Sequence, residues 1–264
     1  MILSELEAVI ASRAVSGSLS QLISDKIPLN SQIAPLDTSA TRHRMYLLEE
    51  KGERFVVRAE PDKETLPGVD PFRERNILDA IAHFQWSPKL MINEPQQGVL
   101  IMHHAGECSE LLSPDQKTVL LKAITEMQSL TELPMLDYAA LFQHYRDKLR
   151  DSGHQQLTDE TEQQLLSLPN MPRVLVHHDL HPGNICWQNG DATIIDWEYA
   201  GVGIAWLDYA VLIRDLGFTA SELMQLPLLN AFDEQALTHW LAQSIQVVDQ
   251  LEMLWSHYKS QVTG

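Results

Sequence analysis

The chain has 264 residues, of which 44% are hydrophobic and 21% are charged, a composition typical of a folded globular protein and not of a disordered one. Its 19 Lys and Arg residues are outnumbered by 36 Asp and Glu residues, so the formal net charge is −17. This excess of negative charge argues against binding to nucleic acid or to an anionic membrane surface.

The N-terminal segment and the two cysteines favour a cytoplasmic protein. Glu5 and Glu7 interrupt the stretch in which a secretory signal would need a basic region and an apolar run. No window approaches the roughly 20 apolar residues that a membrane-spanning helix requires. Cys108 and Cys186 lie far apart in the chain, so a disulfide framework is not indicated. We therefore expect a cytoplasmic location, whereas the sequence is silent on the oligomeric state.

The first part of the chain has the pattern of a small lobe built around an antiparallel sheet. Alternating and helical apolar spacings predict its elements. In chain order these are a helix over 3–10, strands over 45–48 and 54–59, a helix over 72–84 and a strand over 99–102. A charged turn joins the first two strands into a hairpin. We expect this N-terminal, nucleotide-binding lobe to span residues 1–102.

The remainder, residues 103–264, is predicted to be a larger, mainly helical lobe. Ser113 is a candidate cap for its first helix, with proline at the first helical position. Asn189 and Gly190 between two apolar runs predict a tight hairpin turn. The predicted elements are helices over 114–130, 136–150 and 159–168, strands over 173–176, 185–187 and 192–195, and helices over 204–214, 220–229 and 233–258. The fold class is therefore α+β.

The segment HHDLHPGN is the part of the chain most informative about chemistry. Asp179 and Asn184 have the spacing H-x-D-x-x-x-x-N of a phosphoryl-transfer catalytic loop. Asp179 is the candidate catalytic residue, which would orient an acceptor hydroxyl and accept its proton. Asn184 and Asp196 would supply the hard oxygen ligands that Mg²⁺ prefers.

The HHDLHPGN and IIDWEYAG stretches resemble the two signature motifs of the aminoglycoside phosphotransferase and choline kinase superfamily. This resemblance implies a bilobal, protein-kinase-like fold, with ATP as co-substrate and Mg²⁺ as cofactor. The sequence of the second motif is most similar to that of bacterial thiamine kinases and choline kinases, whose acceptor is a cationic alcohol.

The resemblance also implies nucleotide contacts in the small lobe. Arg58 stands where kinases carry the cation that holds the nucleotide phosphates, and Glu74 would be its ion-pair partner. The interlobe hinge, whose backbone would pair with adenine, is represented by Met102, His103 and His104. The segment 35–44, where the phosphate-covering loop is expected, has no glycine. Its phosphate contacts would come from Ser39, Thr41 or backbone amides.

Three residues near the motifs are candidates for acceptor binding. Trp197 and Glu198 would form the wall and the charge of a pocket for a cation, and His181 would line the same pocket. The alternative for each is an ordinary structural role: core packing for Trp197 and His181, and a structural ion pair for Glu198.

Other residues are expected to support the site or to be part of the core. His177 would brace the catalytic loop. By resemblance, Asp208 would support the same loop from a nearby helix. The same resemblance implies an aromatic cation pocket at Trp240, Trp255 and Tyr258, whereas helix packing is the more frequent role of such residues. The histidines near the motifs lack the helical H-E-x-x-H pattern of a zinc site.

The sequence therefore predicts an ATP- and Mg²⁺-dependent kinase of a small cationic alcohol, with thiamine as the best single guess. Choline or ethanolamine kinase and aminoglycoside phosphotransferase are alternatives within the same class. A nucleotide-binding pseudokinase is the alternative that is not an enzyme. The presence of Asp179, Asn184 and Asp196 argues against it, because a pure binding module does not need all three.

Overall fold

The computed structural model describes residues 32–36, 44–50, 52–59, 66–150 and 153–262. The predicted helix over 3–10 and the proposed phosphate contacts Ser39 and Thr41 lie outside the described residues. The chain divides into two compact units, Met1–Glu64 with Ser87–Ala105, and Thr65–Trp86 with Gly106–Gly264. Each unit is described by itself.

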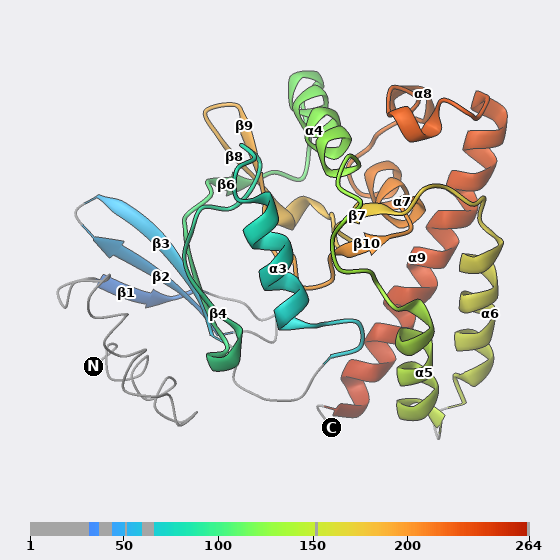
Figure 1. Cartoon of the computed structure of the whole chain (residues 1–264), viewed down its shortest axis with the longest axis horizontal. Helices are drawn as coiled ribbons and strands as arrows, with labels where there is room; N and C mark the ends of the chain where they lie inside the picture. Colours follow the sequence, from blue (N-terminus) through green and yellow to red (C-terminus); the bar gives the residue numbers. More distant parts are fainter. Residues whose placement is uncertain (1–31, 37–43, 51, 60–65, 151–152, 263–264) are drawn as a thin grey trace. The chain divides into compact units, whose positions relative to one another are not determined.

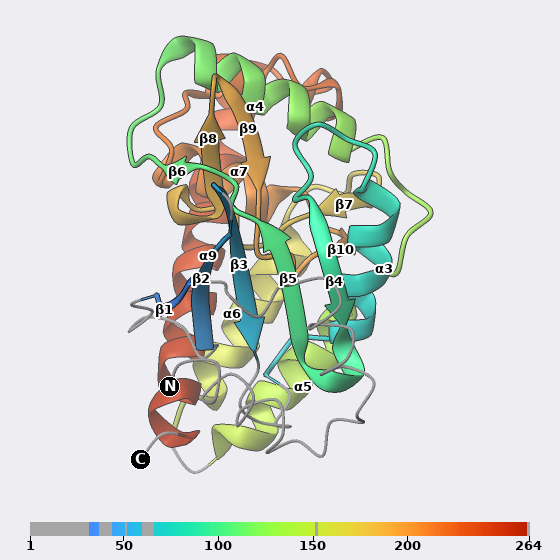
Figure 2. The same cartoon turned by 90° about the vertical axis from the view of Figure 1, so that its left-hand side faces the viewer.

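The first unit contains an antiparallel five-stranded sheet in the order β1-β2-β3-β5-β4 (Figure 2). The predicted hairpin is present, with Leu48 opposite Phe55 in its register. Both side chains are buried. The sequence analysis did not predict β1 or β4. The strands are β1 Gln32–Pro35, β2 Arg44–Glu50, β3 Glu53–Ala59, β4 Leu90–Glu94 and β5 Val99–His103, and the short turn η1 Pro95–Gln97 joins the last two.

The second unit is mainly helical, with two small antiparallel sheets, β6-β8-β9 and β10-β7. Its helices are α3 Pro71–Ile81, α4 Pro114–Met127, α5 Tyr138–Lys148, α6 Gln155–Ser167, α7 Trp206–Arg214, α8 Ala220–Leu223 and α9 Glu234–Val262. Its strands are β6 Glu107–Cys108, β7 Val174–Val176, β8 Ile185–Gln188, β9 Asp191–Ile194 and β10 Gly201–Gly203, with short turns η3 Pro182–Asn184 and η4 Pro227–Leu229.

Helix α7 is the centre of this unit, and it packs against the long helix α9 (Figure 1). Seven of its nine residues are buried, so it is apolar on nearly every face. A helix of that kind has to be covered on all sides. Within the described residues, no helix combines the length and the apolarity needed to cross a bilayer.

Two differences from the predicted organisation concern the region 220–229 and helix α3. The region 220–229, expected to be one helix, is divided into α8 and η4. Pro227 lies at the division, where its missing N–H and its ring prevent a continuous helix. Helix α3 was expected to belong to the N-terminal lobe, but the segment that contains it is part of the second compact unit.

The start of α4 is stabilised by a reciprocal cap. The Ser113 hydroxyl accepts a hydrogen bond from the backbone N–H of Gln116, and the Gln116 side chain accepts one from the N–H of Ser113. We expect Ser113→Ala to lower the free energy of unfolding by about 1 kcal/mol, as measured by urea denaturation. Ser167→Ala, at the exposed end of α6, is the matched control and should change it little. Equal losses in both variants would contradict a capping role.

Candidate active site

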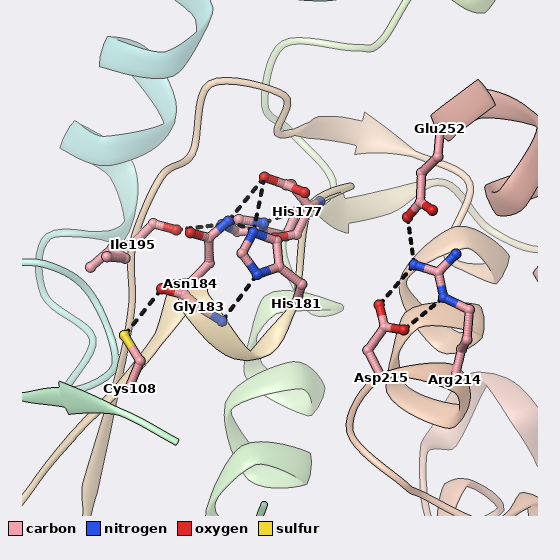
Figure 3. A network of polar contacts seen from close by, with 10 residues as sticks. Cys108, His177, His181, Gly183, Asn184, Ile195, Arg214, Asp215 and Glu252 are labelled. Atoms are coloured by element: carbon pink, nitrogen blue, oxygen red, sulfur yellow. Dashed lines mark hydrogen bonds and ion pairs between the residues drawn. The ribbon is translucent and has the colours of Figure 1, made fainter. Parts of the chain in front are cut away.

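The predicted catalytic loop, residues 177–184, follows β7 directly and is anchored at its first residue. The buried ring of His177 donates from Nε2 to the carbonyl of Ile195 at 2.9 Å and accepts at Nδ1 from the backbone N–H of Asp179 at 3.3 Å (Figure 3). Burial lowers the pKa of His177 to about 4. The ring is therefore neutral near pH 7, and these two bonds assign its tautomer.

A buried carboxylate on α7 holds the same part of the loop. Asp208 Oδ2 and Oδ1 accept the backbone N–H groups of His177 and His178, each at 2.8 Å. Burial raises the pKa of Asp208 to about 6, and the two hydrogen bonds oppose that rise. His178 has φ +66°, a left-handed conformation that is rare outside glycine. Asp208 therefore helps to maintain a backbone shape that the residue would not adopt alone.

His178 is fixed from its side chain as well. Its Nε2 lies 3.0 Å from the Tyr138 hydroxyl, which also accepts the backbone N–H of Ile204 at 2.8 Å. Burial lowers the pKa of His178 to about 3. Tyr138 thus ties the loop to the segment after β10. Its role is not visible in the sequence, since its partners lie 40 and 66 residues away in the chain.

Asp179 and Asn184 are in direct contact, as their spacing predicts for a catalytic loop. The Asn184 amide nitrogen donates to the backbone carbonyl and to Oδ2 of Asp179, both at 2.9 Å. His181 Nε2 lies 3.7 Å from the same Oδ2. Burial raises the pKa of Asp179 to about 6, and the negative charge of Asp196 adds to the rise.

The donor set of this loop suits Mg²⁺. The Asn184 amide nitrogen is directed to Asp179, so its amide oxygen is the atom that can bind a cation. Asp196 supplies a carboxylate from the turn after β9, where its φ is +64°. In the part of the chain that the structure describes, no group of three or more His, Cys, Asp or Glu side chains could hold a metal ion. Phosphate oxygens and water would have to complete the coordination of Mg²⁺.

A cavity of about 840 Å³ lies within the second unit, and Asp179 is one of the residues that line it. His178 and His181 of the catalytic loop also line it. Its walls include the aromatic side chains Phe72, Tyr138, Tyr145, Tyr199 and Trp255. A volume of this size suits a small organic molecule.

One wall of the cavity is formed by a network of charges around Arg214. Its guanidinium binds Asp215 at 2.7 and 2.8 Å and Glu252 at 2.5 Å (Figure 3). It also binds Asp249 at 2.7 Å. Arg214, Asp215 and Glu252 line the cavity. Three carboxylates surround one guanidinium, so the network has an excess of negative charge. The network was not predicted from the sequence, since no local motif joins α7 to α9.

Two of the candidate acceptor residues do not line the cavity. Trp197 is 1% exposed, its indole N–H donates to the carbonyl of Ile194 at 2.8 Å, and its ring packs against Trp86 and His177. Glu198 is also buried. For Trp197 these contacts correspond to the core-packing alternative, because a satisfied indole enclosed by other rings is not available to a ligand. His181, in contrast, lines the cavity.

The aromatic residues of α9 have different environments. Trp255 lines the cavity, and Tyr258 stacks on it with ring centroids 5.8 Å apart. Trp240 is not among the lining residues and contacts His239. Of the three residues of the aromatic cation pocket that was the less favoured interpretation, Trp255 alone is among the lining residues of this cavity.

The predicted nucleotide contacts are divided between the two units. Arg58 on β3 is in the first unit and Glu74 on α3 is in the second, and both are buried. Their pairing remains a prediction. Met102 is buried in β5. The backbone N–H groups of His103 and His104 donate to the carbonyls of Lys89 and Arg54 at 2.9 and 2.8 Å, so the edge of adenine would need a donor other than these two groups.

Comparisons with known proteins agree with this geometry. Residues 116–243 match the model of a family described as the phosphotransferase enzyme family. A choline kinase from Streptococcus pneumoniae is similar in structure, with a TM-score of 0.67 and 19% identity over 94% of this chain and 92% of that one. No curated protein sequence matches the chain.

Two further solved structures have the same fold. A choline/ethanolamine kinase family protein from Mesorhizobium loti has a TM-score of 0.65 and 15% identity over 90% of this chain and 84% of that one. The phosphotransferase APH(2")-IIa in a ternary complex with streptomycin and ATP has a TM-score of 0.63 and 15% identity over 90% of this chain and 93% of that one. The predicted fold class and the resemblance to the aminoglycoside phosphotransferase and choline kinase superfamily are thus confirmed.

Proposed function

We propose, from the match of residues 116–243 to the phosphotransferase enzyme family, that the protein is an ATP-dependent kinase of a small cationic alcohol. The observation that carries the proposal is the position of Asp179. It is hydrogen-bonded to Asn184 within the catalytic loop, and it lines a cavity large enough for an organic acceptor. A hydroxyl bound in that cavity is within the reach of a proton acceptor.

The residues of the loop have separate tasks in this proposal. Asp179 orients the acceptor hydroxyl toward the γ-phosphoryl group and takes its proton as the new O–P bond forms. Asn184 keeps the Asp179 carboxylate in place through its amide nitrogen. Asn184 and Asp196 would hold Mg²⁺, which neutralises charge on the nucleotide phosphates. His177 and Asp208 position the backbone that carries the base.

A positively charged acceptor suits the cavity on two grounds. Two carboxylates of the Arg214 network, those of Asp215 and Glu252, line it beside one guanidinium, and Trp255 and Tyr199 are aromatic residues of its lining that suit a cation. The volume of about 840 Å³ has room for an acceptor larger than choline, which favours thiamine. The likeness to the choline kinase from Streptococcus pneumoniae favours choline. In both cases His181 would contact the acceptor next to Asp179.

Removal of the Trp255 indole should weaken the binding of a cationic acceptor without changing its chemistry. We expect Trp255→Ala to raise KM for that acceptor about 5- to 30-fold, with kcat changed far less, since a desolvated cation–π contact contributes about 1–2 kcal/mol. Steady-state kinetics measures both constants. Trp240→Ala is the matched control, because it removes the same side chain from the same helix outside the cavity. A rise in KM of equal size in the control would exclude a specific contact.

The acceptor is identified by ADP release from ATP and Mg²⁺ in the presence of thiamine, choline, ethanolamine, an aminoglycoside or a sugar. We expect one of the cationic alcohols to be turned over much faster than the sugars. Fast turnover of choline without turnover of thiamine would assign the choline kinase alternative. Mg²⁺-dependent binding of ATP without a phosphorylated product from any acceptor would instead identify a pseudokinase.

A further inference from the structure

Two cysteines face each other beside the catalytic loop. Cys108 on β6 and Cys186 on β8 are directly opposite in an antiparallel register, and their Sγ atoms are 3.1 Å apart. Directly opposed residues of antiparallel strands have Cα atoms about 4.5–5.5 Å apart, which is within the range that a disulfide spans. The two strands are therefore already spaced for a bond between these side chains.

The pair also contacts the loop that carries the proposed base. Cys108 Sγ donates a hydrogen bond to the backbone carbonyl of Gly183, at 3.1 Å (Figure 3). Gly183 is the central residue of η3, directly before Asn184. A thiol hydrogen of Cys108 therefore helps to hold the turn that presents the amide of Asn184.

The approach of β6 to β8 is constrained by a glycine next to the pair. A Cβ atom at Gly106 would lie 2.3 Å from the carbonyl oxygen of Trp187, and the φ of Gly106 is +104°. Only glycine fits so close to the neighbouring backbone in that conformation. The segment that carries Cys108 is thus fixed beside Cys186, so the folded backbone keeps the two sulfur atoms close together.

The two thiols differ in the way that an ordered exchange reaction requires. Cys108 is exposed, whereas Cys186 is buried. A dissolved oxidant can therefore reach Cys108 but not Cys186, and it would react first with Cys108.

We propose that Cys108 and Cys186 form a reversible redox site, at which a low-molecular-weight disulfide converts the two thiols into an intramolecular disulfide. The bond would replace the hydrogen bond between Cys108 and Gly183 and so disturb the turn before Asn184. The consequence is slower phosphoryl transfer in the oxidised protein. The formation of the disulfide is independent of the proposed function, whereas its effect on turnover rests on it.

The reaction balances as two successive thiol–disulfide exchanges. The Cys108 thiolate attacks one sulfur of the oxidant, forms a mixed disulfide and releases the first small thiol. Cys186 then loses its proton and attacks the sulfur of Cys108, which releases the second small thiol. Two protein thiols are oxidised, and one disulfide of the oxidant is reduced to two thiols. Dithiothreitol reverses both steps.

The test exposes the folded full-length protein to oxidised glutathione and maps the products by intact mass and non-reducing peptide mapping. We expect the chain to lose two hydrogens in mass and to yield a peptide that links Cys108 to Cys186, both reversed by dithiothreitol. Retention of both free thiols would overturn the proposal. So would a stable glutathione adduct on either cysteine of the unmodified chain without the cross-link.

Single substitutions distinguish the roles of the two cysteines in the exchange. In the Cys186→Ser variant the exchange should stop at the mixed disulfide on Cys108, because no second thiol is present to displace the bound glutathione. Cys108→Ser should remain unmodified, since the remaining cysteine is buried. A stable adduct on Cys186 in the second variant would contradict the proposed order of attack.

Turnover is then compared between the reduced protein and the purified disulfide form. We expect kcat to be about fivefold lower after oxidation, the equivalent of one neutral hydrogen bond, and to recover with dithiothreitol. Cys108→Ala lacks the thiol and should be insensitive to the oxidant. Equal kcat in both forms would show that the disulfide does not slow phosphoryl transfer through the loop. A disulfide that forms in a protein inactive toward every acceptor would contradict the proposed function and leave the redox site intact.

Discussion

Asp179→Asn is expected to lower kcat with the preferred acceptor by about 10²- to 10⁴-fold, the usual contribution of a positioned general base. Asparagine preserves the shape of the side chain and can still accept the hydrogen bond from Asn184 through its oxygen. It cannot accept the proton of the acceptor hydroxyl. KM for ATP should change little, because Asp179 touches the acceptor in this mechanism.

Acceptor-dependent ADP release measures the loss of kcat, and the thermal unfolding temperature shows that the variant is folded. Asp191→Asn, in the exposed hairpin between β8 and β9, is the matched control and should retain full turnover. A folded Asp179→Asn variant with near-normal kcat would refute the assignment of this residue as the base.

Asp208→Asn should affect both stability and turnover. The carboxylate accepts two backbone N–H groups of the loop, and an amide can accept only one of them while its own NH₂ group faces the other. We expect the free energy of unfolding to fall by about 2–4 kcal/mol, from a lost charge-assisted bond and a buried donor without an acceptor. kcat should fall as well, since the backbone at His178 loses its support.

Urea denaturation measures the first effect and steady-state kinetics the second. Asp249→Asn is the control for stability: its carboxylate binds Arg214 at 2.7 Å but is largely exposed, so its removal should cost less than about 1 kcal/mol. If Asp208→Asn destabilised the protein no more than this control, the anchoring role of Asp208 would be disproved.

The elements that were predicted correctly are those with a clear local sequence pattern, and the elements without one were missed. The hairpin of β8 and β9 was predicted correctly, since Asn189 and Gly190 adopt φ +54° and +90°, the left-handed conformations that this turn needs. Strands β6 and β10, of two and three residues, were not predicted, whereas β7, also of three residues, was predicted because its run of Val174 to Val176 is entirely apolar. Such short strands exist through pairing with distant partners, and their own residues show no alternation.

The candidate site was predictable where its residues are close in the chain. Asp179 and Asn184 lie five residues apart, and their contact follows from the turn between them. The Arg214 network joins residues up to 38 positions apart across two helices, and no local pattern signals it. Trp197 illustrates the converse, because its position directly after Asp196, the predicted metal ligand, does not reveal that its side chain faces the core.

The left-handed backbone at His178 has a consequence for the adaptation of the protein to heat. A non-glycine residue held at φ +66° stores local strain of about 1–3 kcal/mol, so glycine at this position would relieve it. Glycine would also remove the imidazole that contacts Tyr138 and would loosen the residue next to the base. The relief of strain and the loss of this contact therefore act in opposite directions on the free energy of unfolding, so glycine offers no simple route to a more heat-stable protein.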